Sequence, residues 1–190
     1  MAFERIVEAL IKEALERGEF DNLPGKGKPI DLTDKVIDFL QSRSIDRIHL
    51  EPHVLDELAL EKAGITVSHA SDAALRVGVT KAVCGLADTG SILIADGEGD
   101  PLQASLLPEI HIAVLCISDI LPSLADAMRL PILRQSRAAV VITGPSRTAD
   151  IEMSLTIGVH GPGEVHVFLV HSTAGTLVHR TVSTLVLAQS

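Results

Sequence analysis

Three apolar runs in the second half of the chain decide the fold: IHIAVLCI at residues 110–117, AAVVIT at residues 138–143 and VHVFLV at residues 165–170. They are almost continuously apolar, as strands buried on both faces of a sheet should be. Between them, the spacing of apolar residues predicts helices at residues 118–128 and 147–156. The alternation of strand and helix implies βαβ crossovers and therefore a sheet that is at least partly parallel.

Three earlier runs also predict strands: ITVSH at residues 65–69, AVCGLA at residues 82–87 and SILIA at residues 91–95. Asp88, Thr89 and Gly90 join the last two runs, which predicts a hairpin. In such a turn Asp bonds its own backbone and Gly supplies a positive φ. The same tetrapeptide, Asp-Thr-Gly-Ser, carries the catalytic carboxylate of aspartic proteases. A single copy would require a homodimer, and those proteases are almost wholly β, so the turn is the favoured interpretation.

The first third of the chain predicts helices and a loop. Residues 3–11 repeat apolar side chains at helical spacing, and the Gly- and Pro-rich segment GEFDNLPGKGKPIDL follows at residues 18–32. Thr33 is a predicted N-cap, and Pro52 is predicted to begin a second helix that Gly64 ends. At the other end, we expect residues 171–190 to be an edge strand or a flexible tail. The predicted parts are therefore residues 1–32, a helix with an extended arm, and residues 33–190, an α/β domain.

Composition limits the classes of function. The chain has 190 residues, no Trp or Tyr and a net charge of −9, which argues against nucleic-acid binding. No apolar run is long enough to span a membrane and no signal peptide is evident, so we expect a cytoplasmic protein. Cys84 and Cys116 lie in apolar runs and are predicted to be buried, reduced thiols. Without a CxxC pattern, no iron–sulfur cluster, structural zinc or other cofactor is expected on this chain.

A possible ligand-binding loop follows the run at residues 138–143. The strand is predicted to end at Thr143, a Gly-Pro turn follows, and Ser146 is a predicted helix N-cap. Backbone N–H groups at such a junction bind anions, and Arg147 adds positive charge. Asp150 and Glu152 would either repel an anion or complement the helix dipole. Open α/β sheets bind ligands beyond the carboxyl ends of their strands, which is where this loop is expected to lie.

Histidines offer weaker candidates. His160 lies in a Gly-rich loop that suits a ligand or a general base, whereas His166 is expected to be packed within a strand. Together with Asp150, Glu152 and His171 they show no metal-ligand spacing, so no metal site is predicted. His69 and Ser71, near the end of an earlier strand, are further possible pocket residues.

Four motifs in order, ADTGS, LLPEIH, TGPSRTADIE and GVHGP, resemble the lactate utilization protein C family. The resemblance covers roughly residues 33–170 and is densest from Gly64 onward. It implies a three-layer α/β fold, with a mostly parallel sheet flanked by helices, grouped with sugar-phosphate isomerase and CoA-transferase-like proteins. It also implies two iron–sulfur partner proteins that act with this component to oxidise L-lactate to pyruvate. The resemblance does not settle the chemistry of this component.

The resemblance carries the family's motif residues to this chain. They are Asp88, Thr89, Gly90, Pro108, His111, Thr143, Gly144, Ser146, Thr148, Asp150, Glu152, His160 and Gly161. Our hypothesis is that the first group, Asp88, Thr89 and Gly90, meets the last group, His160 and Gly161, at one end of the sheet and that they form a polar pocket. Ser146 and the backbone near Gly144 would bind an acid or phosphate group. Asp88, Asp150 or His160 would transfer protons.

The segment at residues 18–32 resembles a domain of unknown function found in J-domain cochaperone-like proteins, a match that covers about residues 3–32. Three hypotheses follow. The first is an accessory component of L-lactate oxidation that binds a small organic acid or phosphate-bearing ligand, works with iron–sulfur subunits and can form a homo-oligomer. The second is a stand-alone enzyme acting on a sugar phosphate or CoA thioester, by superfamily analogy. The third is a non-catalytic regulatory protein that docks through its N-terminal arm.

Overall fold

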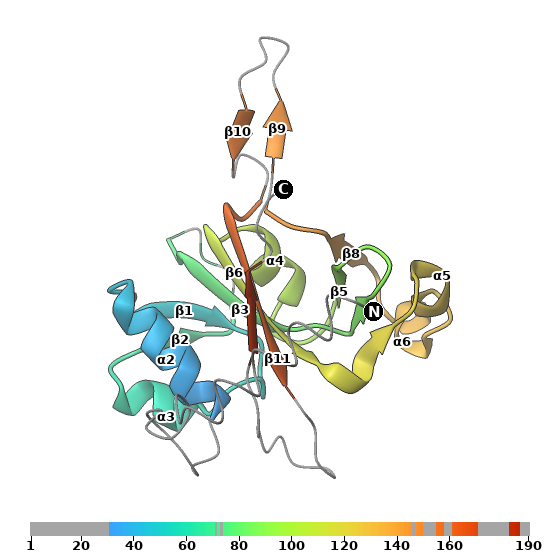
Figure 1. Ribbon diagram of the computed structural model, residues 1–190. Helices are drawn as coiled ribbons and strands as arrows, with labels where there is room; N and C mark the ends of the chain where they lie inside the picture. Colours follow the sequence, from blue (N-terminus) through green and yellow to red (C-terminus); the bar gives the residue numbers. More distant parts are fainter. Residues whose placement is uncertain are drawn as a thin grey trace, which may run out of the picture. The chain divides into compact units, whose positions relative to one another are not determined.

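The fold is described from a computed structural model (Figure 1), which describes residues 31–70, 72, 74–145, 147–149, 155–157, 161–170 and 183–186. The chain divides into two compact units, Met1–Ile30 and Asp31–Ser190, and every described residue belongs to the second. The predicted N-terminal helix and most of the predicted arm therefore lie outside the described residues. No helix in the described part is long and apolar enough to cross a membrane.

A mostly parallel sheet of six strands forms the centre of the described unit. Its order is β12-β11-β6-β3-β1-β2. The strands are β1 (Arg47–Leu50), β2 (Thr66–Ser68), β3 (Val77–Lys81), β6 (Ile110–Cys116), β11 (Glu164–Val170) and β12 (Ser183–Val186). All neighbours are parallel except β12, which pairs antiparallel with β11. The prediction of a mostly parallel α/β fold is confirmed, and β12 is the edge strand expected in the last segment.

A second sheet of four strands has the order β7-β4-β5-β8. Its strands are β4 (Cys84–Leu86), β5 (Ser91–Ala95), β7 (Ile120–Leu121) and β8 (Ala139–Ile142). The predicted hairpin between β4 and β5 is confirmed, because the two strands pair antiparallel with Leu86 opposite Ser91. Gly90 has a φ of 67°, and its N–H donates to the Leu86 carbonyl at 2.9 Å. A separate antiparallel pair joins β9 (Arg147–Ala149) to β10 (Leu155–Ile157).

The two faces of the central sheet are covered differently. Helices α2 (Leu32–Ser42) and α3 (Glu57–Lys62) cover one face, whereas α4 (Pro101–Leu106) and the second sheet pack on the other (Figure 1). Successive side chains of β6 point to opposite faces of the sheet. Val114 packs in the core under the helices, and Leu115 packs in the core on the other face. A Cβ at Gly78 would overlap the carbonyl oxygen of Ala104, so only glycine lets α4 lie against β3.

Two central strands, β1 and β3, were not predicted. The sequence of β1, RIHL, contains an Arg and a His among four residues, and so lacks an apolar run. His49 is nevertheless buried, because its Nε2 hydrogen-bonds the Gly99 carbonyl at 2.8 Å. In β3, Gly78 interrupts the apolar pattern of the strand, because a side chain there would overlap the carbonyl oxygen of Ala104.

The helix boundaries at the start of the unit differ from those predicted. Asp31, not Thr33, is the N-cap of α2, and its Oδ1 accepts the Thr33 N–H at 2.7 Å. The Thr33 hydroxyl instead accepts the Asp56 N–H at 3.2 Å, which ties the starts of α2 and α3 together. Helix α3 begins at Glu57, capped by Asp56, so the predicted start at Pro52 was wrong. The predicted end was right, since Gly64 has a φ of 82°.

Both helices predicted in the second half of the chain, at residues 118–128 and 147–156, were wrong. The first is replaced by a turn of 3-10 helix, η1 (Ile117–Asp119), then β7, and by α5 (Leu124–Ala127) and α6 (Pro131–Gln135). Pro122 lies between β7 and α5, where a continuous helix would lose a backbone hydrogen bond. The second is replaced by β9 and β10. Strand β8 joins the second sheet, so the crossover from β6 to β11 passes through that sheet rather than through a simple βαβ unit.

Candidate functional site

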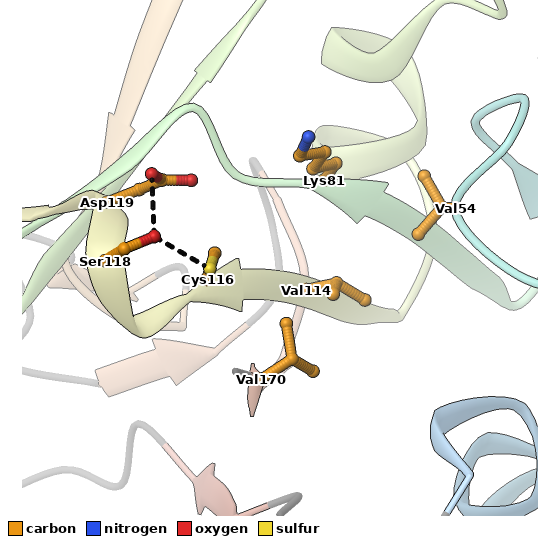
Figure 2. Close-up of a pocket in the computed structure, with 7 residues that line it drawn as sticks. All are labelled: Val54, Lys81, Val114, Cys116, Ser118, Asp119 and Val170. Carbon is orange, nitrogen blue, oxygen red and sulfur yellow. Dashed lines mark hydrogen bonds between the residues drawn. The ribbon is translucent and has the colours of Figure 1, made fainter. Parts of the chain in front are cut away.

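The carboxyl ends of three parallel strands border a cavity of ≈ 130 Å³ (Figure 2). It is lined by Lys81 at the end of β3, Val114 and Cys116 of β6, Val170 at the end of β11, Ser118 and Asp119 of η1, and Val54. The carboxyl edge is where open parallel sheets bind their ligands. This cavity is therefore the leading candidate site in the described part of the chain.

One wall of the cavity is a short chain of polar side chains placed by η1. Cys116 Sγ lies 3.0 Å from Ser118 Oγ, and the Ser118 hydroxyl donates to Asp119 Oδ1 at 3.3 Å (Figure 2). The chain leaves β6 and immediately makes one 3-10 turn, so the side chains of Cys116, Ser118 and Asp119 reach the same cavity.

Lys81 brings positive charge to the cavity. Among the described residues, no carboxylate forms an ion pair with its ammonium group. Its backbone N–H donates to Glu51 Oε2 at 2.7 Å, while the Glu51 N–H donates to the Val79 carbonyl at 3.0 Å. Burial raises the pKa of Glu51, and this outweighs the Lys81 N–H bond and charge, which lower it.

Both cysteines are buried and free of disulfide bonds, as predicted. Burial raises the pKa of the Cys84 thiol, and the negative charge of Asp119 raises it further. A protonated thiol is a poor nucleophile and metal ligand. Cys84 is part of a buried apolar cluster with Leu86 and Leu93.

A second polar cluster brings two of the predicted motifs together. Ser91 Oγ donates to Thr89 Oγ1 at 2.8 Å and lies 3.0 Å from Thr143 Oγ1. The cause is the antiparallel pairing of β5 with β8, which sets Ile92 opposite Ile142 and Ser91 beside the end of β8. An apolar cavity of ≈ 180 Å³, lined in part by Ser91, Leu115 and Leu169, separates this hairpin from β6 and β11.

Apart from the buried Ser91, the residues of these two motifs are exposed or half-buried, including Thr89 and Thr143. Asp88 and Gly90 are exposed on the turn, and Gly144 is half-buried after Thr143. The predicted meeting of Asp88–Gly90 with His160 and Gly161 stays a prediction, because His160 lies outside the described residues. The contact of Thr89 with Thr143 through Ser91 is present. It occurs on the face of the central sheet opposite the Lys81 cavity, because β6 contributes Leu115 to one side and Val114 to the other.

His111 and Pro108 lie at the opposite end of β6 from the Lys81 cavity. Both are buried, and His111 Nε2 is 2.9 Å from the Thr80 hydroxyl. Its Nδ1 has no hydrogen-bond partner among the described residues. Burial lowers the pKa of His111 to about 3, so the imidazole is neutral at physiological pH. This histidine is part of the core, not of the carboxyl edge.

Several predicted site residues lie outside the described residues: Ser71, Ser146, Asp150, Glu152, His160 and His171. Arg147 and Thr148 are described only as backbone of β9, and Gly161 is half-buried before β11. Because Arg147 begins β9, the predicted helix is replaced by a strand from Arg147 onward, whereas anion binding by Ser146 and the backbone near Gly144 stays a prediction.

Two further candidate histidines, His69 and His166, contact neighbouring groups. As expected, His166 is packed within β11, with its ring centroid 4.7 Å from that of Phe39. His69 Nδ1 lies 2.7 Å from the Leu50 carbonyl and its Nε2 lies 3.4 Å from Glu57 Oε2. Within the described ranges, no three His, Cys, Asp or Glu side chains gather as a metal site would require.

Sequence reasoning missed the polar residues of the cavity. Lys81 is the last residue of β3, a strand that was not recognised, and Ser118 and Asp119 were assigned to a helix. If VGVTK had been recognised as a strand, Lys81 would have been placed at its carboxyl end, where open α/β sheets bind their ligands.

Comparison with known proteins gives two family matches. The LUD domain matches residues 61–170. The conserved domain of DnaJ homologue, subfamily C, member 28 matches residues 6–47. The second match extends beyond the resemblance noted at residues 3–32, through α2 and to the first residue of β1.

Individual relatives agree with the first match. Lactate utilization protein C of Geobacillus sp. (strain WCH70) is 32% identical over 120 residues, which cover 60% of this chain and 48% of the relative. Its namesake from Bacillus subtilis (strain 168) is 38% identical over 102 residues, covering 50% and 42% respectively. The chain thus spans about half the length of the curated relatives it matches. A solved DUF162 family protein from Deinococcus radiodurans aligns with a TM-score of 0.41 and 16% identity, over 73% of this chain and 99% of that one.

Proposed function

The chain belongs to the LUD domain family, and from this premise we propose that it is a cytoplasmic accessory component of L-lactate oxidation that binds a small organic acid. The names of its relatives support a place in lactate utilization. The observation that carries the proposal is the Lys81 ammonium, which lines a small cavity without a carboxylate partner among the described residues.

Size and polarity support a small acid. At roughly 30 Å³ for each water, the cavity of ≈ 130 Å³ has room for about four waters, or for an acid of a few carbons. The ligand carboxylate would accept charge-assisted hydrogen bonds from Lys81. Val54, Val114 and Val170 would contact its short apolar part. The nearby Glu51 carboxyl accepts the Lys81 backbone N–H, and burial raises its pKa.

The iron–sulfur chemistry is assigned to partner subunits. A cluster needs about four cysteine ligands, whereas this chain has two cysteines in all, and both are buried. In a host whose own copy has been deleted, the wild-type chain is expected to restore growth on L-lactate and to co-purify with iron-containing proteins.

Binding by Lys81 is tested with Lys81→Met, and Lys35→Met on the exposed face of α2 is the matched control. Titration calorimetry with L-lactate and with pyruvate is expected to detect binding to the wild type. A charge-assisted hydrogen bond is worth about 1.5–3 kcal/mol, so Lys81→Met should weaken binding about tenfold to hundredfold. Lys35→Met should bind as the wild type does.

Two results would contradict the proposal. One is that neither acid binds the wild type. The other is that Thr143→Val, which removes a hydroxyl from the Ser91 cluster, abolishes binding while Lys81→Met does not. The second result would move the ligand to the hairpin motif.

A further inference from the structure

The polar wall of the Lys81 cavity presents hydrogen-bond acceptors rather than donors. The Ser118 hydroxyl has one proton, and it is donated to Asp119 Oδ1 at 3.3 Å. In the contact of 3.0 Å between Cys116 and Ser118, the thiol is then left as the donor. An aspartate carboxylate has only acceptor oxygens. The wall therefore has no free proton to offer a ligand.

This arrangement distinguishes two classes of small acid that differ only at the carbon beside the carboxylate. The hydroxyl of a 2-hydroxy acid donates a proton, whereas the carbonyl oxygen of a 2-oxo acid only accepts. Lys81 attracts the carboxylate of both classes equally and so cannot separate them. Asp119 would accept a hydrogen bond from the hydroxyl, but would face the carbonyl oxygen with no proton between them.

We propose that the cavity selects 2-hydroxy acids over 2-oxo acids and that Asp119 is the specificity-determining residue. The inference rests on the proposed function, since it takes the ligand to be a small organic acid whose carboxylate is held by Lys81. Figure 2 shows the Asp119 carboxylate and the Lys81 side chain among the groups that line the same cavity, as the two ends of such a ligand require. The chain would then retain the reduced member of a hydroxy/oxo pair and release the oxidised one.

The wild type alone gives a first test, by calorimetry with three acids of equal chain length. L-lactate carries a hydroxyl, propionate carries hydrogen and pyruvate carries a carbonyl at the second carbon. We expect lactate to bind at least about tenfold more tightly than pyruvate, because only lactate gains a hydrogen bond to a charged acceptor. Propionate should fall between them, since it neither donates nor repels.

Asp119→Asn gives the second test, because an amide offers a donor as well as an acceptor. In this variant pyruvate should bind more tightly than to the wild type, and the preference for lactate should disappear. Asp38→Asn on the exposed face of α2 changes the net charge equally and should leave the preference unchanged.

The outcomes separate the two proposals. Equal binding of lactate and pyruvate by the wild type, or an unaltered preference in Asp119→Asn, would overturn the selectivity even if Lys81→Met weakened binding as expected. In that case the proposed function would stand. Failure of all three acids to bind would overturn both.

Discussion

The two edges of the parallel sheet each carry a glutamate, and their carboxyl groups behave in opposite ways. At the amino edge, Glu164 accepts from Arg43 Nη1 at 3.0 Å and lies 3.1 Å from His166 Nε2. These bonds, the one to Arg43 first, lower the pKa of Glu164. At the carboxyl edge, burial raises the pKa of Glu51. Glu164 is hydrogen-bonded to Arg43 and His166, whereas burial disfavours the charged form of Glu51.

The difference extends to the neighbouring charges. At the amino edge, Arg76 pairs with Glu109 at 3.0 Å and Arg47 pairs with Asp72 at 3.5 Å, so the charges there neutralise one another. At the carboxyl edge, Lys81 lines a cavity without an ion-pair partner among the described residues. An edge whose charges are already paired contributes to stability, and an edge whose charges are unpaired retains the capacity to bind a ligand.

The largest effect of pH on stability is expected from His111, which lies inside the sheet between the two edges. Its folded pKa of about 3 is below the usual value, so the unfolded chain binds the proton more readily. Full stability is therefore present above about pH 6.5 and is lost as the pH falls. The loss is up to about 1.4 kcal/mol per pH unit, or roughly 5 kcal/mol in total.

Urea unfolding of His111→Gln across this pH range tests the expectation. Gln cannot titrate, and its amide can still bond the Thr80 hydroxyl. The free energy of unfolding of the variant should depend less steeply on pH than that of the wild type. Equal slopes would mean that the folded protein accommodates a charged His111. In the His111→Gln variant, the opposite pH dependences of stability expected from Glu51 and Glu164 should be easiest to measure, because the contribution of His111 is removed.

At the carboxyl edge, Glu51→Gln is expected to stabilise the protein at neutral pH, by less than the His111 effect. The raised pKa means that the folded state favours protonated Glu51, so stability is lost as the pH rises through that pKa. Gln stays neutral and keeps an acceptor for the Lys81 N–H. Thermal unfolding should give a higher midpoint for the variant at pH 7, with the difference shrinking toward pH 4. A lower midpoint at pH 7 would show that the Glu51 charge is stabilising.

At the amino edge, Glu164→Gln should have the smallest effect and the opposite sign. The Glu164 side chain is 44% exposed, so solvent screens its pairs and the loss at pH 7 should be at most about 1 kcal/mol. Because the folded pKa of Glu164 is lowered, this stability is present above its usual pKa and disappears as the pH falls. Added salt should shrink the difference between variant and wild type. A difference that persists in acid and in high salt would contradict the ion-pair account.

The parts of the fold that were predicted depend on neighbours in sequence. Continuous apolar runs identified β6, β8 and β11, and a Gly at the right place in a tight turn identified the β4–β5 hairpin. The helix expected at residues 147–156 failed for the converse reason. The short apolar pattern of this segment fits both the helical and the strand period. Antiparallel pairing between β9 and β10 makes these residues strands.

The candidate site was predicted less well because its residues meet only after folding. Thr89 and Thr143 come together through Ser91 because β5 pairs with β8. Lys81 and Asp119 border one cavity because β3 and β6 are adjacent parallel strands that end at the same edge.

By itself, the sequence determined the apolar strands, the Asp-Thr-Gly turn and, through its motifs, the family, because each depends on residues close together in the chain. Tertiary structure alone decided which strands share a sheet, which face each loop covers and which charges remain unpaired. Those properties depend on hydrogen bonds and burial between distant segments, and no local pattern encodes them.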